Sequence, residues 1–126
     1  MRVLDGDQVL MRIFIGEADK HRGRPLYREL VELFRREKLA GATVLRGVEG
    51  FGAKSHMHTT HLLRLSQDLP VVIEVVDGQQ NIDRVMPQID AMVGEGLITM
   101  EKVRVLRYAP TGAAEADSGA GADESV

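Results

Sequence analysis

Residues 71–93 read VVIEVVDGQQNIDRVMPQIDAMV, and this stretch decides the fold because a strand pattern passes directly into a helix pattern. Val71–Val76 is apolar and rich in β-branched residues, which favours a β-strand. From Gly78 the apolar residues recur at helical spacing, which predicts an amphipathic helix that ends at Gly94 and Gly96. The apolar residues of this helix are Ile82, Val85, Met86, Ile89, Met92 and Val93.

The same order of strand and helix occurs near the start of the chain. Gln8–Glu17 predicts the first strand, and the polar residues Asp19–Arg24 predict a loop after it. Pro25 stands where the first helical position is expected. We expect this helix to end at Leu39–Ala40, with Gly41 as its stop signal. Its apolar residues at helical spacing are Leu26, Leu30, Leu33 and Phe34.

Two further segments, Ala42–Glu49 and Thr99–Tyr108, carry strand patterns, and His61–Ser66 is a weaker strand candidate after the loop Gly50–Thr60. Pro87 falls inside the second helix, so we expect a kink or a broken first turn there. The order strand-helix-strand-strand-helix-strand predicts an α+β, ferredoxin-like βαββαβ sandwich. In that fold two helices cover one face of a single antiparallel sheet.

The other face of the predicted sheet has no helix to cover it. Val71–Val76 is apolar on both faces and interrupted only by Glu74, and strands of this kind are usually covered on both sides. The C-terminal residues 110–126 are too polar to supply that cover. We therefore expect a second copy of the chain to cover this face, so that the protein is a homo-oligomer.

Length and composition set limits on the function. The 126 residues suffice for one domain, which we place at residues 1–109, and residues 110–126 predict a disordered acidic tail. Removing the tail's four acids leaves 15 acidic against 16 basic residues, a charge of +1, which speaks against general nucleic-acid binding. The four acids are Glu115, Asp117, Asp123 and Glu124.

Cysteine is absent, which excludes a disulfide framework, a thiolate metal site and a thiol nucleophile. No apolar stretch approaches the roughly 18 residues of a membrane span, so we expect no membrane insertion and a cytoplasmic protein. The sequence also lacks a G-x-S-x-G elbow, a P-loop and an HExxH motif. Ser55 and its neighbouring histidines rarely have the geometry of a catalytic pair, so we expect no enzyme activity.

Two longer stretches carry a family resemblance. GATVLRGVEGFGAKSH (41–56) and IDRVMPQIDAMVGEGL (82–97) resemble the PII-like signalling superfamily, and within it the branch of the domain of unknown function one hundred and ninety. The resemblance extends over about Leu10–Tyr108. It implies a homotrimer, a nucleotide cleft between neighbouring subunits, and regulation of a target without catalysis. A membrane transporter or channel is the kind of target it implies.

The resemblance also implies site residues. Gly50, Phe51 and Gly52 with the turn Gly94, Glu95 and Gly96 would line the nucleotide cleft, which continues through Ala53 and Lys54. The effector it implies is an adenine nucleotide, and the loop of residues 53–59 would contact the target. From the residues alone, glycines let a ligand approach the backbone closely, but a β-bulge before a loop explains the same pattern.

A run of cations precedes the first predicted helix. Lys20, His21, Arg22 and Arg24 lie beside a helix N-terminus, where free amides and clustered bases favour a phosphate or another small anion. The alternative is a solvated run of charges whose mutual repulsion is screened by salt.

Three histidines lie close together in the central loop. His56, His58 and His61 offer imidazole nitrogens for a divalent metal such as zinc, copper or nickel. A metal-binding trimer of the CutA-like kind is the alternative function that they suggest. Solvent-exposed histidines that titrate near neutral pH explain the pattern equally simply.

Overall fold

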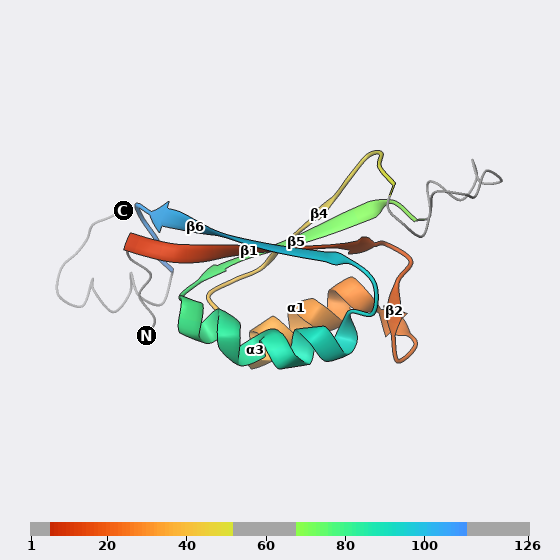
Figure 1. The fold of residues 1–126 in the computed structure, drawn as a ribbon, viewed down its shortest axis with the longest axis horizontal. Coiled ribbons are helices and arrows are strands. Elements are labelled where there is room, and N and C mark those ends of the chain that lie inside the picture. Colours follow the sequence, from red (N-terminus) through yellow and green to blue (C-terminus); the bar gives the residue numbers. More distant parts are fainter. Residues whose placement is uncertain (1–5, 52–67, 111–126) are drawn as a thin grey trace.

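The computed structural model describes residues 6–51 and 68–110, which form a four-stranded antiparallel sheet with two helices on one face (Figure 1). The order of strands across the sheet is β4-β5-β1-β6, and a separate two-stranded hairpin, β2 and β3, follows β1. The elements are β1 (Gly6–Gly16), β2 (Lys20–His21), β3 (Arg24–Pro25), α1 (Leu26–Arg36), β4 (Thr43–Arg46), β5 (Pro70–Asp77), α3 (Gln79–Met92) and β6 (Leu97–Val105).

The strand pairing confirms the predicted ferredoxin-like arrangement. Since β5 is antiparallel to both β1 and β4, these two strands are parallel to each other with β5 between them. In the same way β5 and β6 are parallel with β1 between them. Each strand-helix-strand unit is thus split by a strand of the other unit, which is the split βαβ fold.

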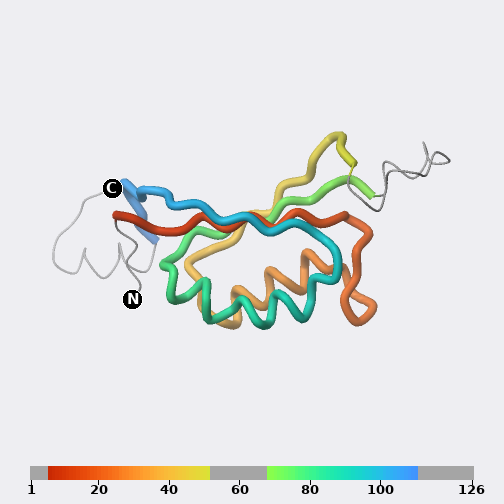
Figure 2. Tube along the Cα trace, in the orientation of Figure 1, coloured from red at the N-terminus to blue at the C-terminus, as the bar shows by residue number. Residues whose placement is uncertain are grey.

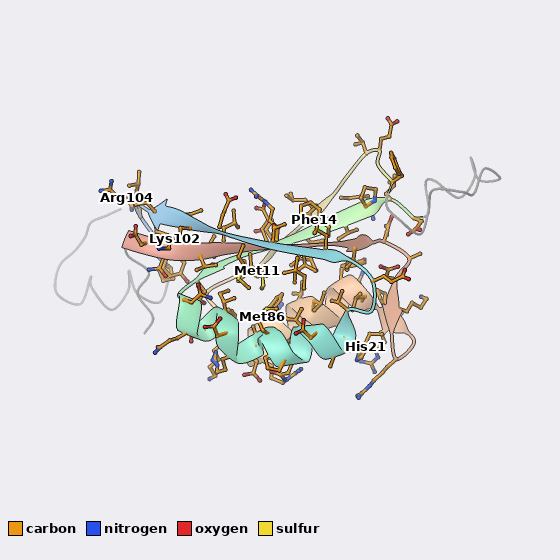
Figure 3. All side chains as sticks on the ribbon, viewed as in Figure 1. Met11, Phe14, His21, Met86, Lys102 and Arg104 are labelled. Carbon is orange, nitrogen blue, oxygen red and sulfur yellow. The ribbon has the colours of Figure 1, made fainter. Side chains whose placement is uncertain are left out.

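The core lies between the sheet and the two helices. Alternate residues of β1 and β5 point into it, and α1 and α3 contribute the apolar residues that the helical spacing predicts. Met11 on β1 and Met86 on α3 both lie in this layer (Figure 3). The fully enclosed apolar side chains include Met11, Ile13, Leu30, Leu33, Ile73, Ile82, Val85 and Ile89.

The connection from β1 to α1 differs from the prediction. The predicted loop Asp19–Arg24 contains the hairpin, because Arg22 and Gly23 form a two-residue turn in which His21 faces Arg24. Pro25 is the residue before the helix, with φ −54° and ψ 126°, and not its first helical position. Its extended ψ ends the hairpin and its missing N–H costs nothing at that place.

The helix ends also differ from the prediction. Helix α1 ends at Arg36, before the predicted Leu39–Ala40, because Lys38 turns the chain with a φ of 63° and Gly41 is not needed as the stop. Helix α3 is continuous across Pro87, so a broken first turn is wrong. Pro87 lies on the exposed face of α3, where water can satisfy the carbonyl group that the proline leaves without a partner.

The strands begin and end within a few residues of the predicted bounds. The largest difference in length is at β4, which covers only Thr43–Arg46 of the predicted Ala42–Glu49. The strand candidate His61–Ser66 and the acidic residues 111–126 lie outside the described residues. Within 6–51 and 68–110, no helix has the length and apolar character that crossing a membrane requires.

Two ends of the sheet can be told apart by the chain direction. We call the end at which β1 and β4 finish and β5 and β6 begin the distal end, which is on the right in Figure 2. The β2–β3 hairpin, residues 47–51 and residues 93–96 all belong to the distal end. The connections from α1 to β4 and from β5 to α3 belong to the opposite end.

Candidate functional site

The three segments with predicted site residues that the structure describes, 20–24, 50–51 and 94–96, all lie at the distal end. Gly50 and Phe51 follow the edge strand β4, whereas Gly94–Gly96 precedes the opposite edge strand β6. The two edges are three strand spacings apart, roughly 14 Å at about 4.8 Å per spacing. One chain therefore does not bring the two glycine segments together.

The cationic residues lie on the β2–β3 hairpin. Arg22 and Gly23 form its tip with φ values of 55° and 80°, as in type I′ turns, and Figure 3 shows His21 beside them. Arg24 lies 3.8 Å from Glu29, while Lys20 and Arg22 have no ion-pair partner within the described residues. The first amide of α1, at Leu26, is not free, because it donates to the carbonyl of Asp19.

A left-handed conformation is uncommon for arginine. Type I′ turns favour glycine at this position because it has no Cβ atom to clash with the backbone, and asparagine or aspartate because their short polar side chains hydrogen-bond to the nearby backbone. The hairpin thus holds a cation at its tip, at a position where glycine or asparagine would cause less backbone strain. The predicted cluster of cations is present, although on a hairpin instead of a loop.

Close packing against Pro70 explains why residue 50 is a glycine. A Cβ atom at Gly50 would lie 3.1 Å from the ring of Pro70, and one at Gly47 would lie 2.8 Å from the same ring. The amide of Gly47 also donates to the Pro70 carbonyl at 2.7 Å. Residues 47–50 are therefore wrapped around Pro70. Next to them, the side chains of Val48 and Phe51 are 93% and 85% exposed.

The turn Gly94–Gly96 also combines a tightly packed glycine with exposed neighbours. A Cβ atom at Gly96 would lie 2.8 Å from the carbonyl oxygen of Phe14 and 3.2 Å from the Ile15 side chain, so this glycine allows β6 to start close against β1. Gly94 has open space around its missing Cβ, and Glu95 is exposed. In this turn only Gly94 and Glu95 leave room for a ligand.

An ion pair that the sequence analysis did not predict connects the ends of strands β4 and β1 at the distal end. Arg46, the last residue of β4, donates from Nη2 to the Oε2 atom of Glu17, the first residue after β1. The amide of Glu17 in turn donates to the Leu69 carbonyl at 2.8 Å. The two residues are far apart in sequence. The one feature of the sequence that could have drawn attention to Arg46 is its position directly before the glycine-rich segment.

Two aspartates lie beside this pair. Asp19 accepts a hydrogen bond from the Gly16 amide at 2.9 Å, and Asp68 accepts one from the Ala18 amide at 3.3 Å. Both carboxylates approach the missing Cβ of Gly16, whose space they fill. They fix the corner where β1 leaves the sheet and thereby position Glu17.

The face of the sheet away from the helices, which no helix among residues 6–51 and 68–110 covers, carries an apolar row across all four strands. Residues in register share a face, and Leu45, Val72, Phe14 and Leu97 are in register from β4 to β6. Phe14 lies on the side away from the helices in Figure 3. Leu97 is 56% exposed. The row therefore ends at both edges of the sheet in exposed leucines.

A charged row lies next to the apolar one. Arg12 Nε donates to Glu74 Oε2 at 2.9 Å, and Arg12 Nη1 lies 3.8 Å from Glu101 Oε1. The hydrogen bond with Glu74 raises the pKa of Arg12, against the opposite effect of burial. The charged guanidinium therefore links β1 to both of its neighbours, β5 and β6, on this face.

Several predicted residues fall outside the described residues. They include the whole histidine set, on which the predicted metal site depends. Among the residues that are described, no group of three or more His, Cys, Asp or Glu side chains is arranged to hold a metal ion. The predicted residues concerned are Gly52, Ala53, Lys54, His56, His58 and His61.

A protein-family model matches nearly all of the described residues. The model of the family described as DUF190, uncharacterized ACR, matches residues 8–105. The chain belongs to the DUF190 family. A UPF0166 protein of Aquifex aeolicus is 37% identical over 97 residues, which cover 77% of this chain and 91% of that relative. The resemblance stated from the two quoted stretches is therefore confirmed.

Solved structures similar to this DUF190 chain are PII-like proteins. A putative PII-like signaling protein from Thermus thermophilus has a TM-score of 0.55 and 16% identity, with 81% of this chain and 93% of that chain covered. CPII from Thiomonas intermedia, bound to ADP, AMP and acetate, has a TM-score of 0.51 and 16% identity, with coverages of 83% and 94%. At these identities the likeness confirms the PII-like fold.

Proposed function

We propose that this DUF190 chain is a cytoplasmic PII-like regulatory protein without catalytic activity. In this proposal it assembles as a homotrimer and binds an adenine nucleotide in clefts between subunits. The loop that contains residues 53–59 contacts the target, for which we propose a membrane transporter or channel. The effector is proposed because the similar CPII structure contains ADP and AMP.

The observation that carries the proposal is the position of the two glycine segments. Gly50–Phe51 and Gly94–Gly96 lie at the same end of the sheet but at opposite edges. A cleft with both segments in its wall therefore takes one from each of two neighbouring chains. Phe51 would supply an exposed ring for the base, since aromatic rings stack on bases.

The cations of the hairpin support a phosphate-bearing ligand. The hairpin leaves β1 next to the point where Gly96 packs against Phe14, so it lies on the same side of the cleft as Gly94. Lys20, Arg22 and Arg24 would then face the phosphates, and the base would face Phe51 of the neighbouring chain.

The uncovered apolar row supports the assembly. It runs from Leu45 on one edge strand to Leu97 on the other, so both edges that would meet in a cleft carry an exposed leucine. Apolar surface of this kind is stabilised by association with another copy. Leu97 and Leu45 would come close to their counterparts where neighbouring sheets meet.

Calorimetric titration with ADP and with adenosine tests the proposal. We expect the wild-type chain to bind both and to bind ADP more tightly, because only ADP engages the hairpin cations. Arg22→Asn is the sharpest variant, since asparagine suits a type I′ turn while it removes the tip cation. It should lower ADP affinity about tenfold, the value of one charge-assisted hydrogen bond, without loss of stability.

The matched control for this variant is Arg35→Asn, which removes an exposed arginine from the other end of α1, where it pairs with Glu32. It should leave ADP affinity unchanged. Absence of heat from the wild-type chain with either compound would disprove nucleotide binding. A monomer by sedimentation equilibrium would disprove the cleft between subunits.

A further inference from the structure

We propose that Arg46 binds a phosphate group of the effector and that Glu17 sets the affinity by holding Arg46 in the unliganded chain. This inference rests on the proposed function, because it takes an anionic effector at the distal end as given. It assigns a binding role to Arg46 and a positioning role to Glu17, and neither the sequence analysis nor the family resemblance gives these two residues a role.

The position of Arg46 places its charge beside the proposed cleft. Arg46 ends β4 and directly precedes the segment that wraps around Pro70 and leads to Phe51. Its register partner is Val71, which is buried under the helices, so Arg46 is on the helix side of the sheet. The β2–β3 hairpin contacts α1 and so lies on the helix side of its sheet as well (Figure 1). In the proposed cleft, Arg46 of one chain would therefore face the hairpin of its neighbour, and a phosphate group between them would reach both.

The two partners of the ion pair are held unequally. The Glu17 side chain is 21% exposed and its backbone is fixed by the hydrogen bond to Leu69, whereas the Arg46 side chain is 59% exposed. An exposed ion pair of this kind contributes little stability, so breaking it costs little. Arg46 is therefore the partner that can turn toward a ligand while Glu17 stays in place.

A phosphate group competes well for such an arginine. It carries more negative charge than a carboxylate and accepts two parallel hydrogen bonds from a guanidinium group. The other charged groups at this corner, Asp19 and Asp68, already accept hydrogen bonds from backbone amides and repel an incoming anion. Glu17 adds to that repulsion and also neutralises Arg46, so it weakens effector binding in two ways.

Three variants test the inference by calorimetric titration with ADP. Arg46→Gln should weaken ADP binding about tenfold or more, the value of a hydrogen bond to a charged group. Glu17→Gln should tighten it by about two- to fivefold, the value of an exposed ion pair that no longer competes. In the double variant the effect of Glu17→Gln should be much smaller, because most of it acts through Arg46.

The matched controls are Arg35→Gln and Glu32→Gln, which break another exposed ion pair at a distance from the distal end. Both should leave ADP affinity unchanged. Arg46→Lys keeps the charge and should keep part of the affinity, which separates binding from a loss of folding. Circular dichroism melting of each variant checks that the fold is retained.

The outcomes separate this inference from the proposed function. If the wild-type chain binds ADP but Arg46→Gln and Arg46→Lys both bind as the wild type does, the inference is wrong and the proposed function stands. If Glu17→Gln tightens binding equally with and without Arg46, Glu17 acts by repulsion alone and its assigned role is wrong. If the wild-type chain binds no ADP, both fail together.

Discussion

Asp77→Ala should destabilise the chain more than any surface substitution, because Asp77 is a fully enclosed carboxylate that accepts several hydrogen bonds. It accepts hydrogen bonds from the amides of Ala40 and Gly78 at 2.8 and 2.7 Å and from the Asn81 side chain at 2.9 Å. Each buried donor left without an acceptor costs about 1–3 kcal/mol. Since water will reach these part-buried donors to some extent, we expect a loss of about 3–5 kcal/mol.

Urea unfolding followed by circular dichroism, at one fixed protein concentration, measures this loss. Asp77→Asn keeps one acceptor oxygen and should lose about 1–2 kcal/mol, because its amide group faces one of the donors. Asp83→Ala is the control: Asp83 accepts an exposed hydrogen bond from Gln79, and its removal should cost no more than about 0.5 kcal/mol. A loss below about 1 kcal/mol for Asp77→Ala would refute the reasoning.

Three further substitutions have expected outcomes. Gly96→Ala should destabilise by about 1–3 kcal/mol in urea unfolding, because its Cβ would lie 2.8 Å from the Phe14 carbonyl and backbone must shift; wild-type stability would contradict the close packing. Gly50→Ala should cost less, about 1 kcal/mol, because the Pro70 ring can yield; a loss equal to that of Gly96→Ala would show that it cannot. Leu97→Glu should lower the mass found by sedimentation equilibrium, whereas Lys102→Glu on the other face of β6 should not; equal masses would exclude the apolar row from the interface.

The elements were predictable because their patterns are long and regular. The helices α1 and α3 follow a clear helical apolar spacing, and the strands β1 and β5 are apolar runs rich in β-branched residues. The layer arrangement then follows, because two helices and one sheet have a single way to bury their apolar faces. Composition and spacing alone were enough for this part of the fold.

The connections were less predictable because one residue decides each of them. The hairpin depends on Arg22 adopting a positive φ, which arginine rarely does, and the end of α1 depends on the same conformation at Lys38. Neither residue is a turn signal in sequence. The Glu17–Arg46 pair was missed for another reason, since its partners meet only after β4, β5 and β1 have paired.

The places of the candidate residues in the fold follow from the predicted elements, but the packing contacts of each residue do not. Gly50 and Gly96 match a ligand-binding pattern, yet the space beside each is filled by Pro70 or by the Phe14 carbonyl. Substitution of either glycine therefore changes backbone packing before it changes any ligand contact, and a loss of binding would not identify a ligand residue. The charged residues Arg22 and Arg46 do not have this ambiguity. Both are exposed at the distal end, and each has a replacement that removes the charge without a packing conflict, so the identity of the ligand is best tested through them.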